Sequence, residues 1–258
     1  MSESTENPSR DLPATDGSPT PRFSLRSLLI GTMVICVLLA AIVPLVRHVQ
    51  HVQRRAQQWQ CQNNLRSIAS ALHCYYDVHK SLPCVITYAA DGTPLHSWRV
   101  PLLPYFDYAV RWPDYDYREP WNGPNNSLSY KGLKGPWCPP CYRCPGAPPS
   151  RNGACTDYVM LIDDRPGKPN GPPHLPGSAP PSLDPKSAVI VIEIADSDIH
   201  WMKPRDVLLS ELSMKINDRS KRSLSSYHGG ACVVHADGSV ELLDDATTEE
   251  RVRELLTQ

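Results

Sequence analysis

An uninterrupted apolar run from Leu28 to Val46 constrains this chain more than any other feature of its sequence. The run has no charged residue, and a helix of its 19 residues reaches about 28 Å, close to the hydrocarbon thickness of a bilayer. A buried helix of a soluble protein normally keeps a polar face, which this run lacks. A cleaved signal peptide has a shorter apolar region and a small-residue cleavage site, whereas Pro44 to Arg47 makes a poor site. We therefore expect one membrane-spanning helix, with those two readings as the alternatives.

The expected span divides the chain into four parts. Residues 1–21 are rich in Ser, Thr, Pro, Asp and Glu and predict a disordered tail. Residues 22–46 comprise the membrane helix and its flank, and residues 47–83 predict an amphipathic helix continuous with it. Residues 84–258 predict a globular domain, and its segment 110–186 holds so many Pro and Cys residues that we expect long loops there.

The amphipathic part carries an apolar stripe whose members recur at spacings of mostly three or four residues. The apolar face of such a helix is expected to pack on the globular domain. Ser81 to Pro83 is expected to end the helix. The stripe consists of Val49, Val52, Ala56, Trp59, Leu65, Ile68, Leu72 and Tyr75 or Tyr76.

Charge and cysteine content bear on partners and compartment. The formal net charge of -1 argues against nucleic-acid binding, because no basic excess is present to neutralise phosphates. Eight of the nine cysteines lie outside the apolar run, which is compatible with disulfides in an oxidising compartment or with buried thiols. Arginines flank the run almost equally on both sides, so the cysteines decide the expected topology: a cytoplasmic N-terminus and an extracytoplasmic C-terminal domain.

Several short segments of the globular part predict regular structure. Alternating or continuous apolar residues bounded by turn signals are typical of strands, and Asp-Gly pairs favour tight hairpins. A Thr followed by acidic residues is typical of a helix start. The expected strands are Val85–Tyr88, Ala188–Ile194, Ala231–His235 and Ser239–Leu243, and the final helix begins at Thr247 or Thr248.

The stretch from Pro44 to Pro83 resembles the beginning of the DUF1559 family, a bacterial family of unknown function that is abundant in planctomycetes. The family pattern reads approximately Cys-x-Asn-Asn-Leu-x-x-Ile-x-x-Ala-Leu-His-x-Tyr. The matching residues are Cys61, Asn63, Asn64, Leu65, Ile68, Ala71, Leu72, His73 and Tyr75. Further similar blocks are Ser97–Val100, Leu102–Tyr105, Pro120–Asn126, Arg143–Pro145, Trp201–Asp206, His228–Gly230 and Ala236–Val240.

The resemblance implies an α+β, pilin-like fold in which a long N-terminal helix lies across an antiparallel sheet. It implies no established activity. Arg22 and Ser27 stand where a pilin signal has Gly and usually Glu, which argues against prepilin-type processing. The C-terminal signature of His228, Asp237 and Gly238 has eight residues between the His and the Asp, where the family usually has nine.

The Cys-rich segment is the strongest candidate for chemistry. The Cys-x-x-Cys spacing of Cys138 and Cys141, followed by Cys144, suits a tetrahedral metal site or a redox dithiol. Cys155 or His174 could supply a fourth ligand. Local disulfides or free thiols that stabilise a loop are the alternative.

Two further groups of polar residues are weaker candidates. Glu193, Asp196, Asp198, His200 and Asp206 lie at and just after the end of the strongest strand and could bind Ca²⁺, although a solvated loop with turn-forming aspartates explains the pattern better. If the last strand extends to Asp237, the side chains of His235 and Asp237 share a face and could form a base–acid pair. Ser225 and Ser226 lack a recognisable nucleophile motif, so we expect no enzyme and no cofactor.

Two functional hypotheses remain. The first is a single-pass membrane-anchored, pilin-like protein with a structural or protein-interaction role at the cell envelope, where envelope or secretion proteins are candidate partners. The second is a membrane-tethered module that binds a metal or ligand through the Cys-rich loop or the acidic cluster.

Overall fold

The computed structural model describes residues 24–106, 115–126, 138–148, 153–165 and 188–257. It separates into two compact units, Met1–Val49 and Gln50–Gln258. The predicted tail, 1–21, and much of the predicted loop segment, including His174, lie outside the described residues.

Helix α1, Leu25–His79, contains the apolar run and the amphipathic segment. Among the described residues it is the one helix long and apolar enough to cross a membrane, and none of its most apolar stretch is buried within the protein. Pro44 lies inside the helix without ending it. The helix ends before the expected Pro83, because Lys80 adopts a left-handed conformation with φ of 58° that closes the last turn onto the Tyr76 carbonyl oxygen.

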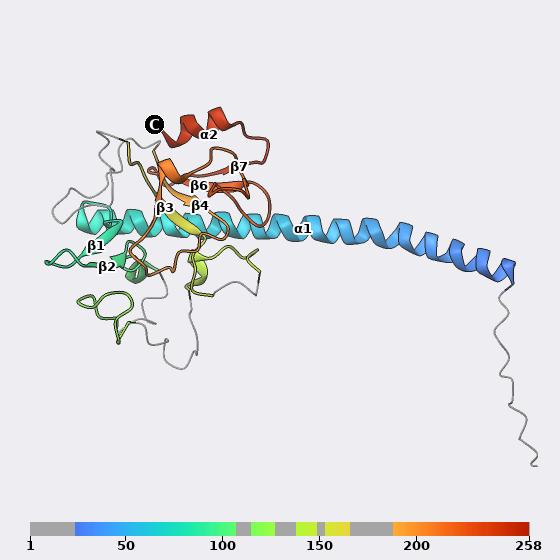
Figure 1. Cartoon of the computed structure of the whole chain (residues 1–258), viewed down its shortest axis with the longest axis horizontal. Coiled ribbons are helices and arrows are strands. Elements are labelled where there is room, and N and C mark those ends of the chain that lie inside the picture. Colours follow the sequence, from blue (N-terminus) through green and yellow to red (C-terminus); the bar gives the residue numbers. More distant parts are fainter. Residues whose placement is uncertain (1–23, 107–114, 127–137, 149–152, 166–187, 258) are drawn as a thin grey trace, which may run out of the picture. The chain divides into compact units, whose positions relative to one another are not determined.

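A five-stranded sheet forms the centre of the globular unit, in the order β5-β3-β4-β6-β7 (Figure 1). The pairs β3–β4, β4–β6 and β6–β7 are antiparallel, whereas β3 and β5 are parallel, so the sheet is mixed. The fold is α+β, as the sequence predicts. The strands are β3 Tyr158–Ile162, β4 Val189–Glu193, β5 Val207–Leu208, β6 Ala231–His235 and β7 Val240–Leu243.

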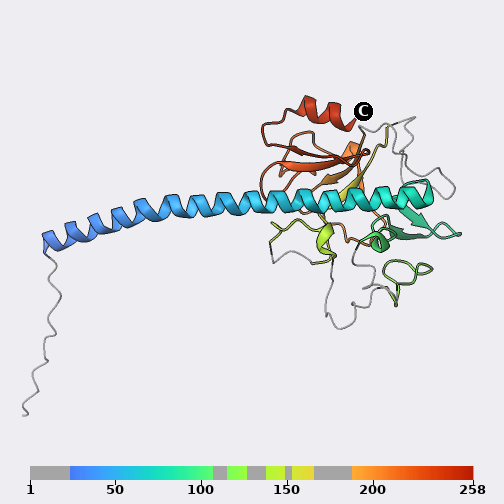
Figure 2. The same cartoon turned by 180° about the vertical axis from the view of Figure 1, so that it is seen from behind.

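The two faces of the sheet carry separate hydrophobic cores, because successive side chains of a strand point to opposite faces. One face meets the C-terminal part of α1, and the other meets helix α2, Glu249–Leu256 (Figures 1 and 2). The α1 side includes Leu65, Ile68 and Leu72 with Met160, Ile190, Cys232 and Val234. The α2 side includes Val252, Leu255 and Leu256 with Val159, Ile192, Val233 and Leu243.

The buried face of α1 begins at Cys61. Cys61, Leu65, Ile68 and Leu72 are each 0% exposed and follow one another at spacings of four, three and four residues. The first half of the predicted stripe does not pack on the domain, since Val52 is 51% and Trp59 is 63% exposed. An apolar stripe predicts which face of a helix can be buried, but not how far along the helix the domain extends.

The segment before the central sheet forms a small hairpin. Strands β1, Ile86–Tyr88, and β2, Pro94–Ser97, pair antiparallel around a turn at Asp91–Gly92. Short 3-10 turns follow at Leu103–Tyr105, Pro140–Tyr142 and Leu209–Glu211. The prediction of loops throughout 110–186 was wrong at Tyr158–Ile162, which forms β3.

A fully buried ion pair links this segment to the sheet. The Arg99 guanidinium donates to both carboxylate oxygens of Asp206, with the shortest contact 2.7 Å, and both side chains are 0% exposed. Asp206 also accepts from the Trp98 indole N–H and from the Met160 backbone N–H. The guanidinium in turn donates to the Tyr158 carbonyl oxygen. This network connects the residues just after β2 with strand β3 and with the residue just before β5.

We predict that Asp206→Asn lowers the free energy of unfolding by about 3–5 kcal/mol, because it leaves the Arg99 charge buried without its partner. Urea unfolding of the full-length protein in detergent, followed by tryptophan fluorescence, measures the change. Asp116→Asn is the matched control, since its partner Arg118 is 90% exposed and such surface pairs contribute less than about 1 kcal/mol. Equal stability of the two variants would contradict the role of the buried pair.

Candidate functional site

Four side chains from distant parts of the chain converge in the core beneath α1. They are Cys61, Cys144, Glu193 and His228, and their donor atoms all lie within 4.8 Å of one another. All four residues are buried. Among the described residues, this is the one group of His, Cys, Asp and Glu side chains that lie close enough together to hold a metal ion.

The two cysteines face each other across the helix–loop contact, with 2.9 Å between their Sγ atoms. Asn64, one turn after Cys61 on α1, donates its side-chain amide to the carbonyl oxygens of Pro140 and Arg143. The buried Asp157 carboxylate accepts the backbone N–H of Cys144 at 2.8 Å. The loop that carries Cys144 is therefore held against α1 by hydrogen bonds on both sides of the thiol.

Glu193 is the last residue of β4 and points to the α1 side of the sheet. Its Oε2 accepts the backbone N–H of Cys232, on the neighbouring strand β6, at 3.0 Å. Its Oε1 is buried without a hydrogen-bond partner and lies 3.4 Å from His228 Nε2. One carboxylate oxygen is thus fixed by the sheet, and the other is directed into the cluster.

His228 lies in the loop before β6, and two glycines shape that loop. Gly229 and Gly230 have φ of 90° and 70°, and a Cβ on Gly230 would collide with the Leu243 carbonyl oxygen. His228 Nδ1 lies 3.1 Å from the Gly229 carbonyl oxygen. Because that oxygen only accepts, a neutral imidazole with its proton on Nδ1 would direct the Nε2 lone pair into the cluster.

The same loop gives the Ser226 hydroxyl a local role. Ser226 Oγ lies 3.1 Å from His228 Nδ1 and accepts the His228 backbone N–H at 3.3 Å. The hydroxyl therefore stabilises the turn that presents the imidazole.

Close packing of the four groups perturbs their protonation. Hydrogen bonding to Cys61 and the nearby His228 lower the pKa of the Cys144 thiol, whereas the contact with Cys144 and burial raise the pKa of Cys61. Burial alone would lower the pKa of His228, but its interactions with Cys144 and Glu193 outweigh burial and raise it to about 10. Interactions within the cluster therefore ease deprotonation of Cys144 and oppose deprotonation of Cys61 and His228.

The structure brings three of the candidate residues into this cluster: Cys144, His228 and, from the predicted acidic group, Glu193. Cys138, Cys141 and Cys155 are also buried but do not join it. Burial raises the pKa of Cys138, and raises that of Cys141 to about 12, which favours neutral thiols.

Sequence reasoning missed Cys61 and Glu193 as members of one site. Cys61 was visible as the first residue of a family block, but nothing in the sequence pairs it with Cys144.

Asp237 and Gly238 form the turn between β6 and β7. The Asp237 carboxylate accepts the Ser239 backbone N–H at 2.8 Å, while His235 contacts Glu241 at 3.1 Å. Gly238 has φ of 86°, and a Cβ there would meet the His73 ring of α1 at 3.1 Å. The signature residues therefore bring this turn close to α1.

The predicted acidic cluster does not assemble. Asp206 is engaged by Arg99, and Glu193 faces the cysteines. Asp196 and Asp198 each have φ of 56°, as expected for turn-forming residues.

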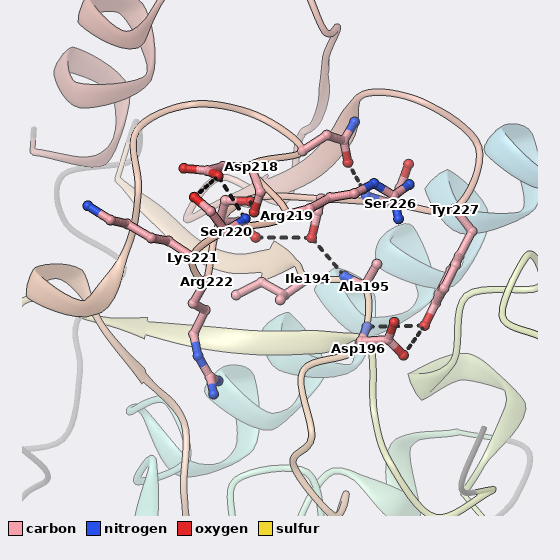
Figure 3. A pocket seen from close by; sticks show the side chains of 13 residues that line it. Ile194, Ala195, Asp196, Asp218, Arg219, Ser220, Lys221, Arg222, Ser226 and Tyr227 are labelled. Atoms are coloured by element: carbon pink, nitrogen blue, oxygen red, sulfur yellow. Dashed lines mark hydrogen bonds between the residues drawn. The ribbon is translucent and has the colours of Figure 1, made fainter.

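A polar pocket of about 480 Å³ lies between the end of β4 and the loop 217–223 (Figure 3). Its rim includes Asp218, Lys221 and Arg222, and on the far side the Tyr227 hydroxyl donates to Asp196 at 2.8 Å. Ser213 and Ser220 donate to the Asp218 carboxylate. Asp196, Asp218 and Tyr227 of this pocket are therefore already engaged in hydrogen bonds.

Comparison with known proteins gives a family and no characterised relative. No curated protein and no solved structure matches the chain significantly. The profile of a family described as protein of unknown function (DUF1559) matches residues 50–208, which is more than half of the chain and includes Cys61, Cys144 and Glu193. The chain belongs to the DUF1559 family.

Proposed function

We propose that this protein is a single-pass membrane-anchored, pilin-like protein with a structural or protein-interaction role at the cell envelope. The observation that carries the proposal is the apolar stretch of α1, which is long enough to span a bilayer and has no part buried within the protein. Such a surface is stable in lipid and costly in water. The proposal assigns no catalytic activity.

The pilin-like character rests on the continuity of α1. One helix of 55 residues contains both the uncharged stretch and the face buried against the sheet. This continuity supports the pilin-like arrangement that the family resemblance implies. Since Arg22 and Ser27 depart from a pilin signal, the proposal does not include prepilin-type processing.

The interaction role is supported by the exposed part of the amphipathic stripe, defined as Val49, Val52, Ala56 and Trp59. Their spacings of three, four and three residues place them on one helix face. Val49, Val52 and Trp59 are 45%, 51% and 63% exposed. Apolar side chains gathered on one exposed face mark a contact surface, and an apolar helix face beside a membrane fits another helix of the envelope.

We predict that a double substitution in the span, Leu38→Arg with Leu39→Arg, releases the protein from membranes, since each arginine costs about 2.5–3.5 kcal/mol at the bilayer centre. Alkaline carbonate washing of vesicles followed by immunoblotting measures release. Val49→Arg with Val52→Arg is the matched control on the same helix, and it stays with the membrane. Release of the wild-type chain, or an intact mass that lacks residues 1–46, would refute the anchor.

The topology has its own test. With a different epitope at each end, protease added to spheroplasts is expected to remove the C-terminal epitope and spare the N-terminal one. We expect this orientation because the domain is rich in cysteines, which fits an oxidising compartment. Protection of both epitopes until the membrane is lysed would place the domain in the cytoplasm.

For the interaction role, we predict that a photo-crosslinking amino acid at Trp59 captures a neighbouring protein in intact membranes and yields a heavier band. The same amino acid at Glu250, which is exposed on α2, serves as the control and yields none. Equal labelling from both positions, or none from Trp59, would contradict a contact surface on α1.

A further inference from the structure

We propose that Cys61, Cys144, Glu193 and His228 bind a zinc ion that fastens α1 to the sheet. This inference goes beyond the proposed function, because it concerns the globular unit alone and holds on either side of the membrane. It rests on the types of ligand present, on two buried polar atoms that form no hydrogen bond, and on the contacts that orient the ligands.

The donor set matches the ligand preferences of zinc. Two thiolates, one imidazole and one carboxylate are the ligand types that bind Zn²⁺, and four protein ligands make a closed structural site. Ca²⁺ and Mg²⁺ prefer oxygen ligands and would leave both sulfurs unused. The four ligands come from α1, a loop, a strand end and a second loop, so one ion would join segments far apart in the sequence.

Two of the four ligand atoms form no hydrogen bond and have only the other members of the cluster near them. Glu193 Oε1 and His228 Nε2 are both buried without a hydrogen bond, and their side chains are 0% exposed. Leaving buried polar atoms unpaired costs free energy, so such atoms normally have a partner. They lie 3.4 Å apart, and nitrogen and oxygen ligands of one tetrahedral zinc lie roughly that far apart, given metal–ligand distances of about 2.0–2.2 Å.

The cysteine pair admits one competing explanation. The 2.9 Å between the Sγ atoms lies between a disulfide bond of about 2.05 Å and the roughly 3.8 Å expected for two thiolates on one zinc. A disulfide would consume both sulfurs and leave Glu193 Oε1 and His228 Nε2 facing each other. A zinc ion would bind all four donor atoms, whereas a disulfide would involve only the two sulfurs. Zinc therefore explains the positions of more of the four side chains.

The surroundings orient the ligands as a metal site requires. The Gly229 carbonyl oxygen sets His228 to present Nε2, and the Cys232 N–H holds the second oxygen of Glu193. Metal-binding histidines and carboxylates typically have such supporting hydrogen bonds.

The test is the metal content of the full-length protein, purified in detergent through a tag that binds no metal and without reductant or chelator. Elemental mass spectrometry should find about one zinc per chain, and His228→Gln and Cys61→Ser should each lose at least nine-tenths of it. Cobalt exchanged into the wild-type site should show a thiolate-to-metal absorption band that Cys61→Ser abolishes.

Matched controls separate ligand loss from damage to the fold. His235→Gln removes a histidine of a separate His–Glu pair, and Cys74→Ser removes an exposed cysteine of the same helix, so both should keep their zinc. Full zinc occupancy in folded His228→Gln would overturn the proposal. So would metal-free wild-type protein, whether peptide mapping finds Cys61 and Cys144 cross-linked or as free thiols. None of these results bears on membrane anchoring, which the carbonate wash tests separately.

Discussion

The packing of the second half of α1 against the central sheet is the contact on which the globular unit depends. The sheet has apolar residues on both faces, and the short α2 covers only one of them. Without α1, the face that contains Met160, Ile190 and Val234 would be exposed to water. The helix that carries the apolar run is therefore also part of the hydrophobic core, and anchoring and folding share one element.

Polar groups set the register of this contact. Asn64 holds the Cys144 loop to the helix, and the turn at Gly238 meets His73 of α1. The cluster of Cys61, Cys144, Glu193 and His228 lies in the same contact between α1 and the sheet. Apolar surfaces can slide past one another at small cost, whereas directional contacts such as these favour one position of the helix. The proposed zinc ion would strengthen that selection.

Much of the fold could be predicted from local signals. The apolar run, the Asp237–Gly238 turn and the Thr248 cap each specify nearby backbone, and β4, β6, β7 and α2 lie where those signals place them. Strand β3 was missed because all five of its residues are apolar, so it lacks alternation, and it lies among prolines and glycines that indicate loops. Strand β5 has only two residues and exists through its pairing with β3.

The site was harder to predict because it is built from residues far apart in the chain. The spacing of Cys138, Cys141 and Cys144 indicated a local metal motif, but only Cys144 reaches the cluster, since its partners come from α1, β4 and the loop before β6. Asp206 was grouped with the nearby Asp196 and Asp198, whereas its partner is Arg99 on a different segment. Sequence patterns show which residues are neighbours along the chain, whereas these residues become neighbours only when the protein folds.

The most direct test of the central claim is amide hydrogen exchange along α1 in the full-length protein in detergent. If the second half of the helix is part of the domain core, the amides of Leu65–Leu72 should exchange as slowly as those of β4, because both are exposed only by global unfolding. The amides of Val52–Ala56, where the helix is exposed, should exchange faster. Exchange of Leu65–Leu72 as fast as that of Val52–Ala56 would contradict the account, because the helix would then be a tether that the domain does not need.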